Sequence, residues 1–252
     1  MNFLALVIPC YNEAERFRKE DFSDFLKGRA NVFLYFVNDG STDQTGVVLQ
    51  DFRQLHPGQV KVLNLSVNVG KAEAVRQGIL EALRSRQIAV VGYFDADLST
   101  PLQEGLRLMV HMDQSSAVMA FGSRIKRLGI RLDRHPFRHY LGRIFATEAS
   151  LLLDLPVYDT QCGAKVFRAE AAREIFDRPF LSRWFFDVEI FFRLKQRFGR
   201  ARTEQLVIEV PLNEWVEQGG SRVKPLDFLR APFELLRIWL AYRAAKPAAE
   251  GR

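Results

Sequence analysis

The feature of this sequence that most constrains its fold is a regular alternation of short apolar runs with longer amphipathic stretches. The apolar runs are rich in β-branched and aromatic residues and cover 4–8, 32–37, 60–65, 88–94 and 117–121. Stretches with helical periodicity separate them, at 43–55, at 71–86 and after Pro101. Strands separated by helices of this length are typical of βαβ units. The pattern therefore predicts an α/β fold with a mostly parallel central sheet flanked by helices.

The second half of the chain is less regular. Helical patterns cover 136–153, 169–176, 187–198 and 226–243, and 205–210 has the composition of a strand. No repeat or linker divides the 252 residues. We expect one domain up to residue 225, followed by an amphipathic helix and a polar tail over 226–252.

Features of membrane-spanning and secreted chains are missing from the sequence. The longest stretch without Asp, Glu, Lys or Arg covers 1–12, shorter than the roughly 20 residues of a membrane span. The N-terminal residues lack a basic segment and a cleavage site. Cys10 and Cys162 are far apart and form no CxxC pair, which favours reduced thiols. We expect a cytoplasmic protein.

Positive charge is concentrated in two parts of the chain. Residues 122–143 hold seven basic residues and one acid, so their net charge of +6 equals that of the whole chain. A second basic excess covers 222–252. Such asymmetry indicates an anionic partner, which is a nucleic acid, a phosphorylated substrate or a membrane surface.

Polar residues follow the ends of the first four predicted strands. They are Pro9-Cys-Tyr-Asn-Glu13, Asn38-Asp-Gly-Ser-Thr-Asp43, Asn68-Val-Gly-Lys71 and Asp95-Ala-Asp97. Parallel sheets bind ligands at the carboxyl ends of their strands. Neither GxGxxG nor GxxxxGK[ST] occurs, so a bound diphosphate needs a cation. The hard carboxylate oxygens of Asp95 and Asp97 suit Mg²⁺ or Mn²⁺.

The competing explanation for Asp97 is a turn or a helix cap. We expect Thr100 to cap the next helix, with Pro101 at its first position and Gln103 completing a capping box. That arrangement leaves Asp97 for the metal. Asp39 lies in Asn-Asp-Gly-Ser, which also forms a favourable turn.

These motifs, in this order and followed by Gly122-Ser-Arg124, resemble the family 2 glycosyltransferases of the GT-A fold, which use nucleotide-diphospho-sugars. Asp159-Thr-Gln-Cys-Gly163, Arg183-Trp-Phe-Phe-Asp-Val-Glu189 and Gly220-Ser-Arg222 are similar to the branch of dolichyl-phosphate β-glucosyltransferases and bacterial polyprenyl-phosphate glycosyltransferases. The resemblance covers most of the chain. One departure is Asn38, where the family usually has Asp.

The resemblance implies an inverting transfer of a sugar, expected to be glucose from UDP-glucose, to a polyisoprenyl phosphate. It places the donor site at the strand ends, with Asp95 and Asp97 at the diphosphate and the metal. The implied nucleotide-binding residues are Pro9, Tyr11, Glu13, Asp39, Lys71 and Asp95.

The basic segments provide candidates for binding the acceptor phosphate, because Arg binds phosphate bidentately. The candidates are Arg124, Arg131, Arg134, Arg138 and Arg222. A solvated basic face is the alternative explanation. The pattern over 226–242 mixes leucines, arginines and aromatic residues, which suits either a helix at an anionic membrane surface or an ordinary helix on the core. We expect peripheral attachment at the inner face of the membrane.

An acceptor hydroxyl needs a general base, whereas an acceptor phosphate is already anionic. Asp187 is the first candidate for a catalytic base and Asp159 the second. Acids in the first turn of a helix also compensate its dipole, which is the alternative role of Asp187. Two other functions remain open: a cytosolic family 2 glycosyltransferase with a soluble hydroxyl acceptor, and a non-catalytic nucleotide-sugar binder. Nucleic-acid binding is disfavoured because no motif of that class occurs and acids line the strand ends.

Overall fold

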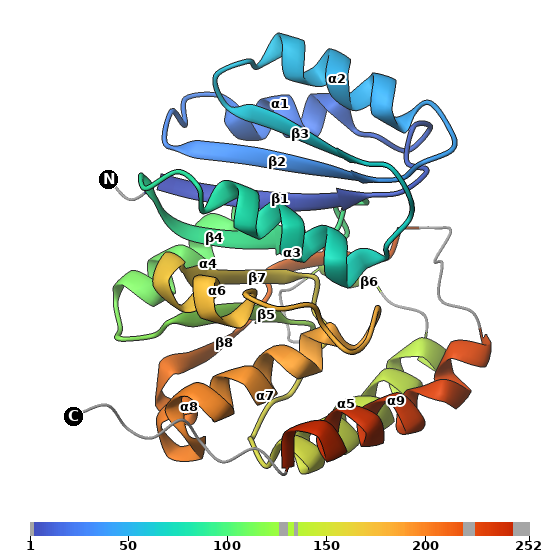
Figure 1. Ribbon diagram of the computed structural model, residues 1–252, viewed down its shortest axis with the longest axis vertical. Helices are drawn as coiled ribbons and strands as arrows, with labels where there is room; N and C mark the ends of the chain where they lie inside the picture. The colour runs from blue at the N-terminus through green and yellow to red at the C-terminus, as the bar shows by residue number, and fades with distance from the viewer. Residues whose placement is uncertain (1–2, 126–130, 134–135, 219–224, 244–252) are drawn as a thin grey trace.

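The computed structural model describes residues 3–125, 131–133, 136–218 and 225–243, and side chains within 3–125, 145–218 and 231–243. Its centre is a seven-stranded sheet in the order β3-β2-β1-β4-β7-β5-β8 (Figure 1). The strands are β1 (Phe3–Cys10), β2 (Val32–Asp39), β3 (Val60–Leu65), β4 (Ile88–Phe94), β5 (Met119–Ser123), β7 (Ala164–Arg168) and β8 (Val207–Pro211). A small second sheet pairs β6 (Arg131–Asp133) with β9 (Glu214–Val216).

The sheet is mostly parallel, as predicted. β7 is the exception, because it runs antiparallel to both of its neighbours, β4 and β5. Its amino end therefore lies at the same edge as the carboxyl ends of β4 and β5. This inserted strand brings the residues before Ala164 to the edge where parallel sheets bind ligands.

The helices that the sequence predicts occur with small shifts at their ends. They are α2 (Thr45–Leu55), α3 (Lys71–Ala82), α4 (Gln103–Asp113), α5 (Pro136–Leu153), α6 (Ala169–Ile175), α7 (Phe186–Phe198) and α9 (Pro225–Arg243). Two short helices, α1 (Lys19–Leu26) and α8 (Arg200–Leu206), were not predicted, and α8 occupies the start of the expected strand at 205. None of the helices in the described part of the chain is long and apolar enough to cross a membrane.

Side chains alternate between two hydrophobic cores, one on each face of the sheet. Val7, Val37 and Tyr93 pack with α3, α6 and α7, which lie in front of the sheet in Figure 1. Ile8 and Phe36 point to the other face, where α1, α2 and α4 pack. Because both faces of the sheet are covered, successive residues of a strand are buried, and each strand is a nearly continuous apolar run in the sequence.

The predicted capping box before α4 is wrong. Leu102 is the N-cap residue and no side chain caps it. Thr100 is buried instead. Asp97 Oδ1 accepts a hydrogen bond from the Ser99 amide (2.9 Å), so Asp97 makes a local turn of the kind that Asp favours. That bond engages one oxygen of Asp97.

Candidate functional site

The carboxyl ends of β1 and β2 are joined by a set of hydrogen bonds between the segments that follow them. Asn12 Oδ1 accepts the Thr42 amide (2.9 Å), and the Glu13 amide donates to Thr45 Oγ1 (2.7 Å). Asn12 has a φ of 50°, a left-handed conformation that Asn tolerates. Tyr11 is half-buried beside it. The two segments therefore form one wall at this edge of the sheet.

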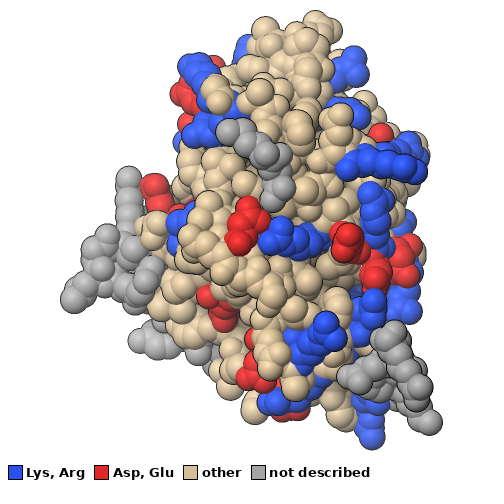
Figure 2. Space-filling model, turned by 90° about the vertical axis from the view of Figure 1, so that its left-hand side faces the viewer, with Lys and Arg blue, Asp and Glu red and all other residues tan. Residues whose placement is uncertain are grey.

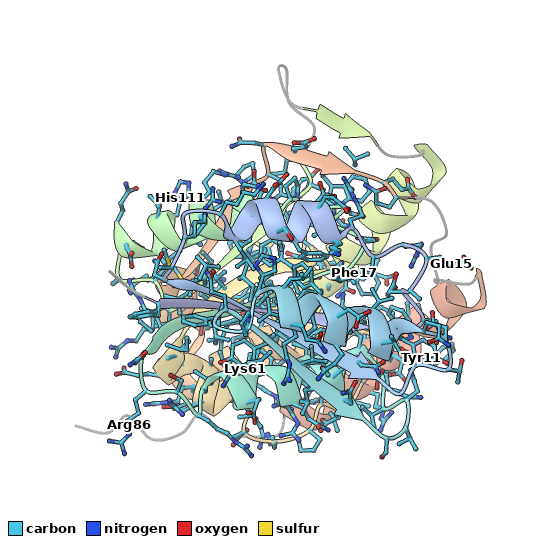
Figure 3. All side chains as sticks on the ribbon, turned by 90° about the horizontal axis from the view of Figure 1, so that it is seen from above. Tyr11, Glu15, Phe17, Lys61, Arg86 and His111 are labelled. Atoms are coloured by element: carbon cyan, nitrogen blue, oxygen red, sulfur yellow. The ribbon has the colours of Figure 1, made fainter. Side chains whose placement is uncertain are left out.

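Tyr11 lies at the end of the molecule where β1 and β2 finish. Figure 3 shows Tyr11 and Glu15 at this end, with Arg86 and His111 at the other. Figure 2 shows the side near the amino end of β1, where acidic and basic side chains are interspersed and no single basic patch is visible. Glu13 is buried and paired with Arg16 (2.8 Å).

Asp39, at the end of β2, is held by the turn that precedes α3. Its Oδ1 accepts the Val69 amide (2.8 Å), and its Oδ2 accepts the Gly70 amide (2.9 Å) and Asn68 Nδ2 (3.1 Å). Asp39 as a whole is only 3% exposed. The predicted contact of Asp39 with the nucleoside thus has to coexist with three protein donors.

Asn38 turns towards the neighbouring strand and away from Asp39. Its Nδ2 donates to Asn64 Oδ1 on β3 (3.0 Å), and its Oδ1 accepts the Ser41 amide (3.2 Å). Asn38 and Asn64 therefore form an amide pair between β2 and β3 at the position where the family usually has Asp.

Lys71 and Asp95 form the centre of the candidate site. Lys71 is the first residue of α3, and its Nζ lies 2.5 Å from Asp95 Oδ1 at the end of β4. The two side chains are 24% and 38% exposed, so the pair remains accessible. Burial by itself would lower the pKa of Lys71, but the charges of Asp95, Asp187 and Asp97 raise it. Lys71 is therefore a cation surrounded by carboxylates.

The loop that precedes β7 touches Asp95. A Cβ added to Gly163 would lie 2.0 Å from Asp95 Oδ2, so only glycine permits this approach. Within the described residues, no cluster of three or more His, Cys, Asp or Glu could hold a metal ion. Binding of a metal by Asp95 and Asp97 therefore stays a prediction.

A buried polar cluster, formed by side chains of β4, β7 and α7, supports the candidate site. Lys165 Nζ, fully buried on β7, donates to Asp187 Oδ1 (2.5 Å) and to the Cys162 carbonyl (2.6 Å). The Tyr93 hydroxyl also donates to Asp187 Oδ1. Burial, followed by the charge of Asp187, raises the pKa of Tyr93 well above its usual value. Sequence reasoning missed Tyr93 and Lys165, although a lysine within an apolar strand was a visible signal.

Arg124, the first acceptor candidate, is paired with Asp159. Its Nε and Nη2 donate to the two carboxylate oxygens (2.7 and 2.8 Å), and its amide also donates to Asp159. Its guanidinium lies 5.6 Å from the centroid of the Trp215 ring. Burial favours the neutral acid of Asp159, but the charge and hydrogen bonds of Arg124 prevail and lower its pKa to about 2. So weak a base is poorly suited to general-base catalysis at neutral pH.

The other arginines predicted to bind the acceptor fall outside the described side chains. Arg131 belongs to β6 and Arg138 to α5, but only their backbone is described. Arg134 and Arg222 lie outside the described residues. Their contact with an acceptor stays a prediction.

A sequence model of the family described as "Glycosyl transferase family 2" matches residues 5–176, more than half of the chain. The chain belongs to glycosyl transferase family 2. The match includes the ends of β1, β2, β3 and β4. The resemblance seen in the motifs is confirmed, and the chain is a glycosyltransferase.

Within family 2 the chain is similar to proteins named dolichyl-phosphate β-glucosyltransferase. It is 31% identical to the ALG5C protein of Trichomonas vaginalis over 255 residues, with 96% of this chain and 72% of the relative covered. It is 32% identical to the human protein of that name, with 95% and 75% covered. The branch suggested by the motifs around Asp159 and Arg183 is confirmed.

Solved structures confirm the GT-A fold. Glucosyl-3-phosphoglycerate synthase from Mycobacterium tuberculosis, in complex with Mn²⁺, UDP-glucose and phosphoglyceric acid, superposes with a TM-score of 0.65 at 17% identity. The superposition covers 98% of this chain and 82% of that protein. At this identity the likeness establishes the architecture alone.

Proposed function

We propose that this glycosyltransferase moves glucose from UDP-glucose to a polyisoprenyl phosphate, with inversion at the anomeric carbon. The observation that carries the proposal is the accessible Lys71–Asp95 pair, placed beside Asp97 in a chain about 30% identical to dolichyl-phosphate β-glucosyltransferases. UDP-glucose is also the donor in the complex of the structural neighbour.

The donor diphosphate is assigned to Lys71, Asp95 and Asp97. A divalent cation, Mg²⁺ or Mn²⁺, would be held by the two carboxylates and would stabilise the charge of the leaving diphosphate. Lys71 supplies a fixed positive charge at the same place, because its raised pKa keeps it protonated at neutral pH. Pro9, Tyr11, Glu13 and Asp39 are assigned to the nucleoside, since the segments after β1 and β2 form the adjoining wall.

The acceptor phosphate is assigned to Arg124 with Arg131, Arg134, Arg138 and Arg222. An anionic phosphate needs positioning more than deprotonation, so the reaction needs no strong base. This fits the geometry of Asp187, which is 4% exposed and already accepts two donors. We assign Asp187 to holding Lys165 and Tyr93 in place, and Asp159 to orienting Arg124.

Access to a lipid acceptor is assigned to peripheral membrane contact through α9. Its Phe233, Leu236 and Leu240 are exposed, although they are large and apolar. Arg237 lies on the exposed surface with them. Apolar residues and arginines together are typical of helices at an anionic lipid surface.

A transfer assay with the purified full chain tests the proposed function. UDP-glucose and other nucleotide sugars are offered with Mn²⁺, Mg²⁺ or EDTA, and the acceptor is either a polyprenyl phosphate in vesicles or soluble phosphoglyceric acid. We expect glucosyl transfer to the lipid phosphate only, and its loss with EDTA. Transfer only to the soluble acceptor would replace the lipid assignment, and transfer undiminished by EDTA would remove the metal.

A further inference from the structure

The turn between β3 and α3 serves the donor site in two ways. The amides of Val69 and Gly70 hold Asp39, and the turn delivers Lys71 to Asp95. The backbone carbonyls of the same turn accept hydrogen bonds from a residue more than a hundred positions away in the sequence. Arg183 Nε donates to the Val69 carbonyl and its Nη2 to the Asn68 carbonyl, both at 3.0 Å.

Arg183 contacts the residue before Lys71 and the residue after it. Gly70 has a φ of +95°, and a Cβ added there would lie 2.6 Å from Arg183 Nε. The guanidinium therefore lies directly against the glycine. Beyond Lys71, the Ala72 amide donates to the Arg183 carbonyl (3.3 Å). Arg183 thus contacts residues on both sides of Lys71.

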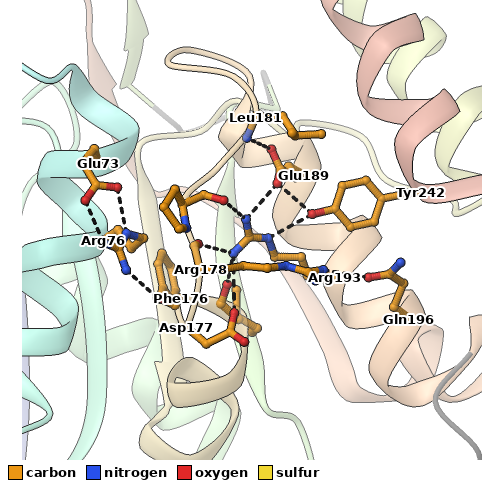
Figure 4. Close-up of polar contacts among 12 residues, drawn as sticks. Glu73, Arg76, Phe176, Asp177, Arg178, Leu181, Glu189, Arg193, Gln196 and Tyr242 are labelled. Carbon is orange, nitrogen blue, oxygen red and sulfur yellow. Dashed lines mark hydrogen bonds and ion pairs between the residues drawn. The ribbon is translucent and has the colours of Figure 1, made fainter. Parts of the chain in front are cut away.

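The segment that carries Arg183 is braced from α7. The Leu181 amide donates to Glu189 Oε2 (2.8 Å), and the fully buried Glu189 pairs with Arg193 (2.8 Å). Figure 4 shows this cluster, in which the Tyr242 hydroxyl of α9 also donates to Glu189. Arg193 donates to three carbonyls of the preceding segment, at residues 175, 178 and 179. Arg183 is therefore anchored to the core of the molecule.

We propose that Arg183 is a positioning residue of the donor site. It holds the Asn68–Val69–Gly70 turn so that the Val69 and Gly70 amides donate to Asp39, and so that Lys71, the first residue of α3, faces Asp95. The assignment of that site to a nucleoside diphosphate rests on the proposed function. The planar fork of Arg matches two adjacent carbonyls, a match that the single ammonium of Lys reproduces in part. Without Arg183, water replaces the two bonds and the turn samples other conformations.

The test compares Arg183→Ala, Arg183→Lys and a control, Arg178→Ala, in the full chain. Arg178 is also exposed and lies in the same stretch, but its side chain reaches Gln196 on α7 and lies 5.9 Å from the centroid of the Tyr242 ring on α9. Amide hydrogen exchange is followed over 66–72 without ligand, the Kd for UDP is measured with Mn²⁺, and KM is measured for both substrates. Thermal unfolding checks that all variants are folded.

In Arg183→Ala we expect faster exchange over 66–72 and a UDP Kd raised about tenfold, because the loosened turn no longer holds Asp39 and Lys71 in place for the donor. KM for UDP-glucose should rise while KM for the lipid phosphate stays the same, and Arg183→Lys should fall between wild type and Arg183→Ala. Exchange equal to that of Arg178→Ala would overturn the proposal, as would faster exchange with unchanged UDP affinity. If wild type binds no UDP, the proposed function fails, while the exchange result still decides whether Arg183 holds the turn.

Discussion

Lys165 is a single buried charge that holds several residues beneath the candidate site in place. Its ammonium is fully buried but finds acceptors in the Asp187 carboxylate and the Cys162 carbonyl. An isolated charge in this position would be far less stable than a paired one. Because Cys162 precedes Gly163, the same ammonium also holds the loop that touches Asp95.

Replacing Lys165 with Met should destabilise the fold by about 3–5 kcal/mol, since it leaves the Asp187 charge buried without its partner. The double variant Lys165→Met/Asp187→Asn should recover most of this loss, because neutral Asn still accepts from the Tyr93 hydroxyl. Urea unfolding of both variants measures the free energies. Lys61→Met serves as the control, because Lys61 also lies on a strand but is exposed. A loss in Lys165→Met no larger than in the control would contradict the role of the pair.

The Arg124–Asp159 pair predicts a dependence of stability on pH. The pKa of Asp159 falls from 3.8 to about 2 on folding, so the pair's contribution is complete above about pH 5 and is lost as the pH falls through 3.8 towards 2. That shift corresponds to about 2–3 kcal/mol. The difference in unfolding free energy between wild type and Asp159→Asn should therefore be constant from pH 7 to 5 and then shrink. A constant difference down to pH 3 would show that Asp159 keeps an ordinary pKa.

At the scale of elements, α9 has both a buried apolar face and exposed apolar residues, so its place on the core leaves the proposed membrane contact open to test. Leu235, Ile238 and Tyr242 are buried, so one face belongs to the core with α5 and α7. Phe233, Leu236 and Leu240 are exposed on the remainder. Removing the whole helix would expose the core and confuse a binding experiment. Substitutions on the exposed face separate membrane contact from folding.

The triple variant Phe233→Ser/Leu236→Ser/Leu240→Ser should lose binding to anionic vesicles while keeping its thermal stability. Burying one such side chain in an apolar phase contributes about 1.5–3 kcal/mol, so vesicle affinity should fall at least about tenfold. The attraction of basic residues to anionic lipid should weaken with salt in both proteins. Vesicle sedimentation at low and high salt measures both contributions.

A matched variant on α5 completes this experiment. Leu151 is 76% exposed and equally apolar, so Leu151→Ser controls for the loss of a surface leucine. If the triple variant sediments with vesicles as well as wild type does, α9 is not the membrane-contacting element. A drop in thermal stability comparable to that of a Leu235→Ala core variant would show that the three side chains belong to the core.

At the scale of the whole molecule, the sequence predicts the positions of those strands and helices that local hydrophobic periodicity determines. The runs at 60–65 and 88–94 are the strands observed, and Asp95, Asp97 and Lys71 could be placed at one edge because parallel strands end together. β7 escaped prediction because Lys165 interrupts its five residues and is stable only with Asp187 from a distant helix. Arg183 escaped because its partners lie across the fold at Asn68 and Val69.

The candidate site draws on segments from Asp39 to Asp187, so donor binding should stabilise the molecule as one unit. A ligand that binds only the folded state contributes about 2.7 kcal/mol at one hundred times its Kd. For a chain of this size that raises the unfolding temperature by roughly 5–10 °C. UDP with Mn²⁺ should therefore shift a single unfolding transition to higher temperature, whereas UDP alone or Mn²⁺ alone should shift it less.

The variant Asp97→Asn should unfold at the same temperature as wild type without ligand, because Asn can still accept the Ser99 amide, but UDP with Mn²⁺ should no longer raise that temperature. Calorimetry that resolves two transitions, with only one responding to UDP and Mn²⁺, would show that the two halves of the sheet unfold separately.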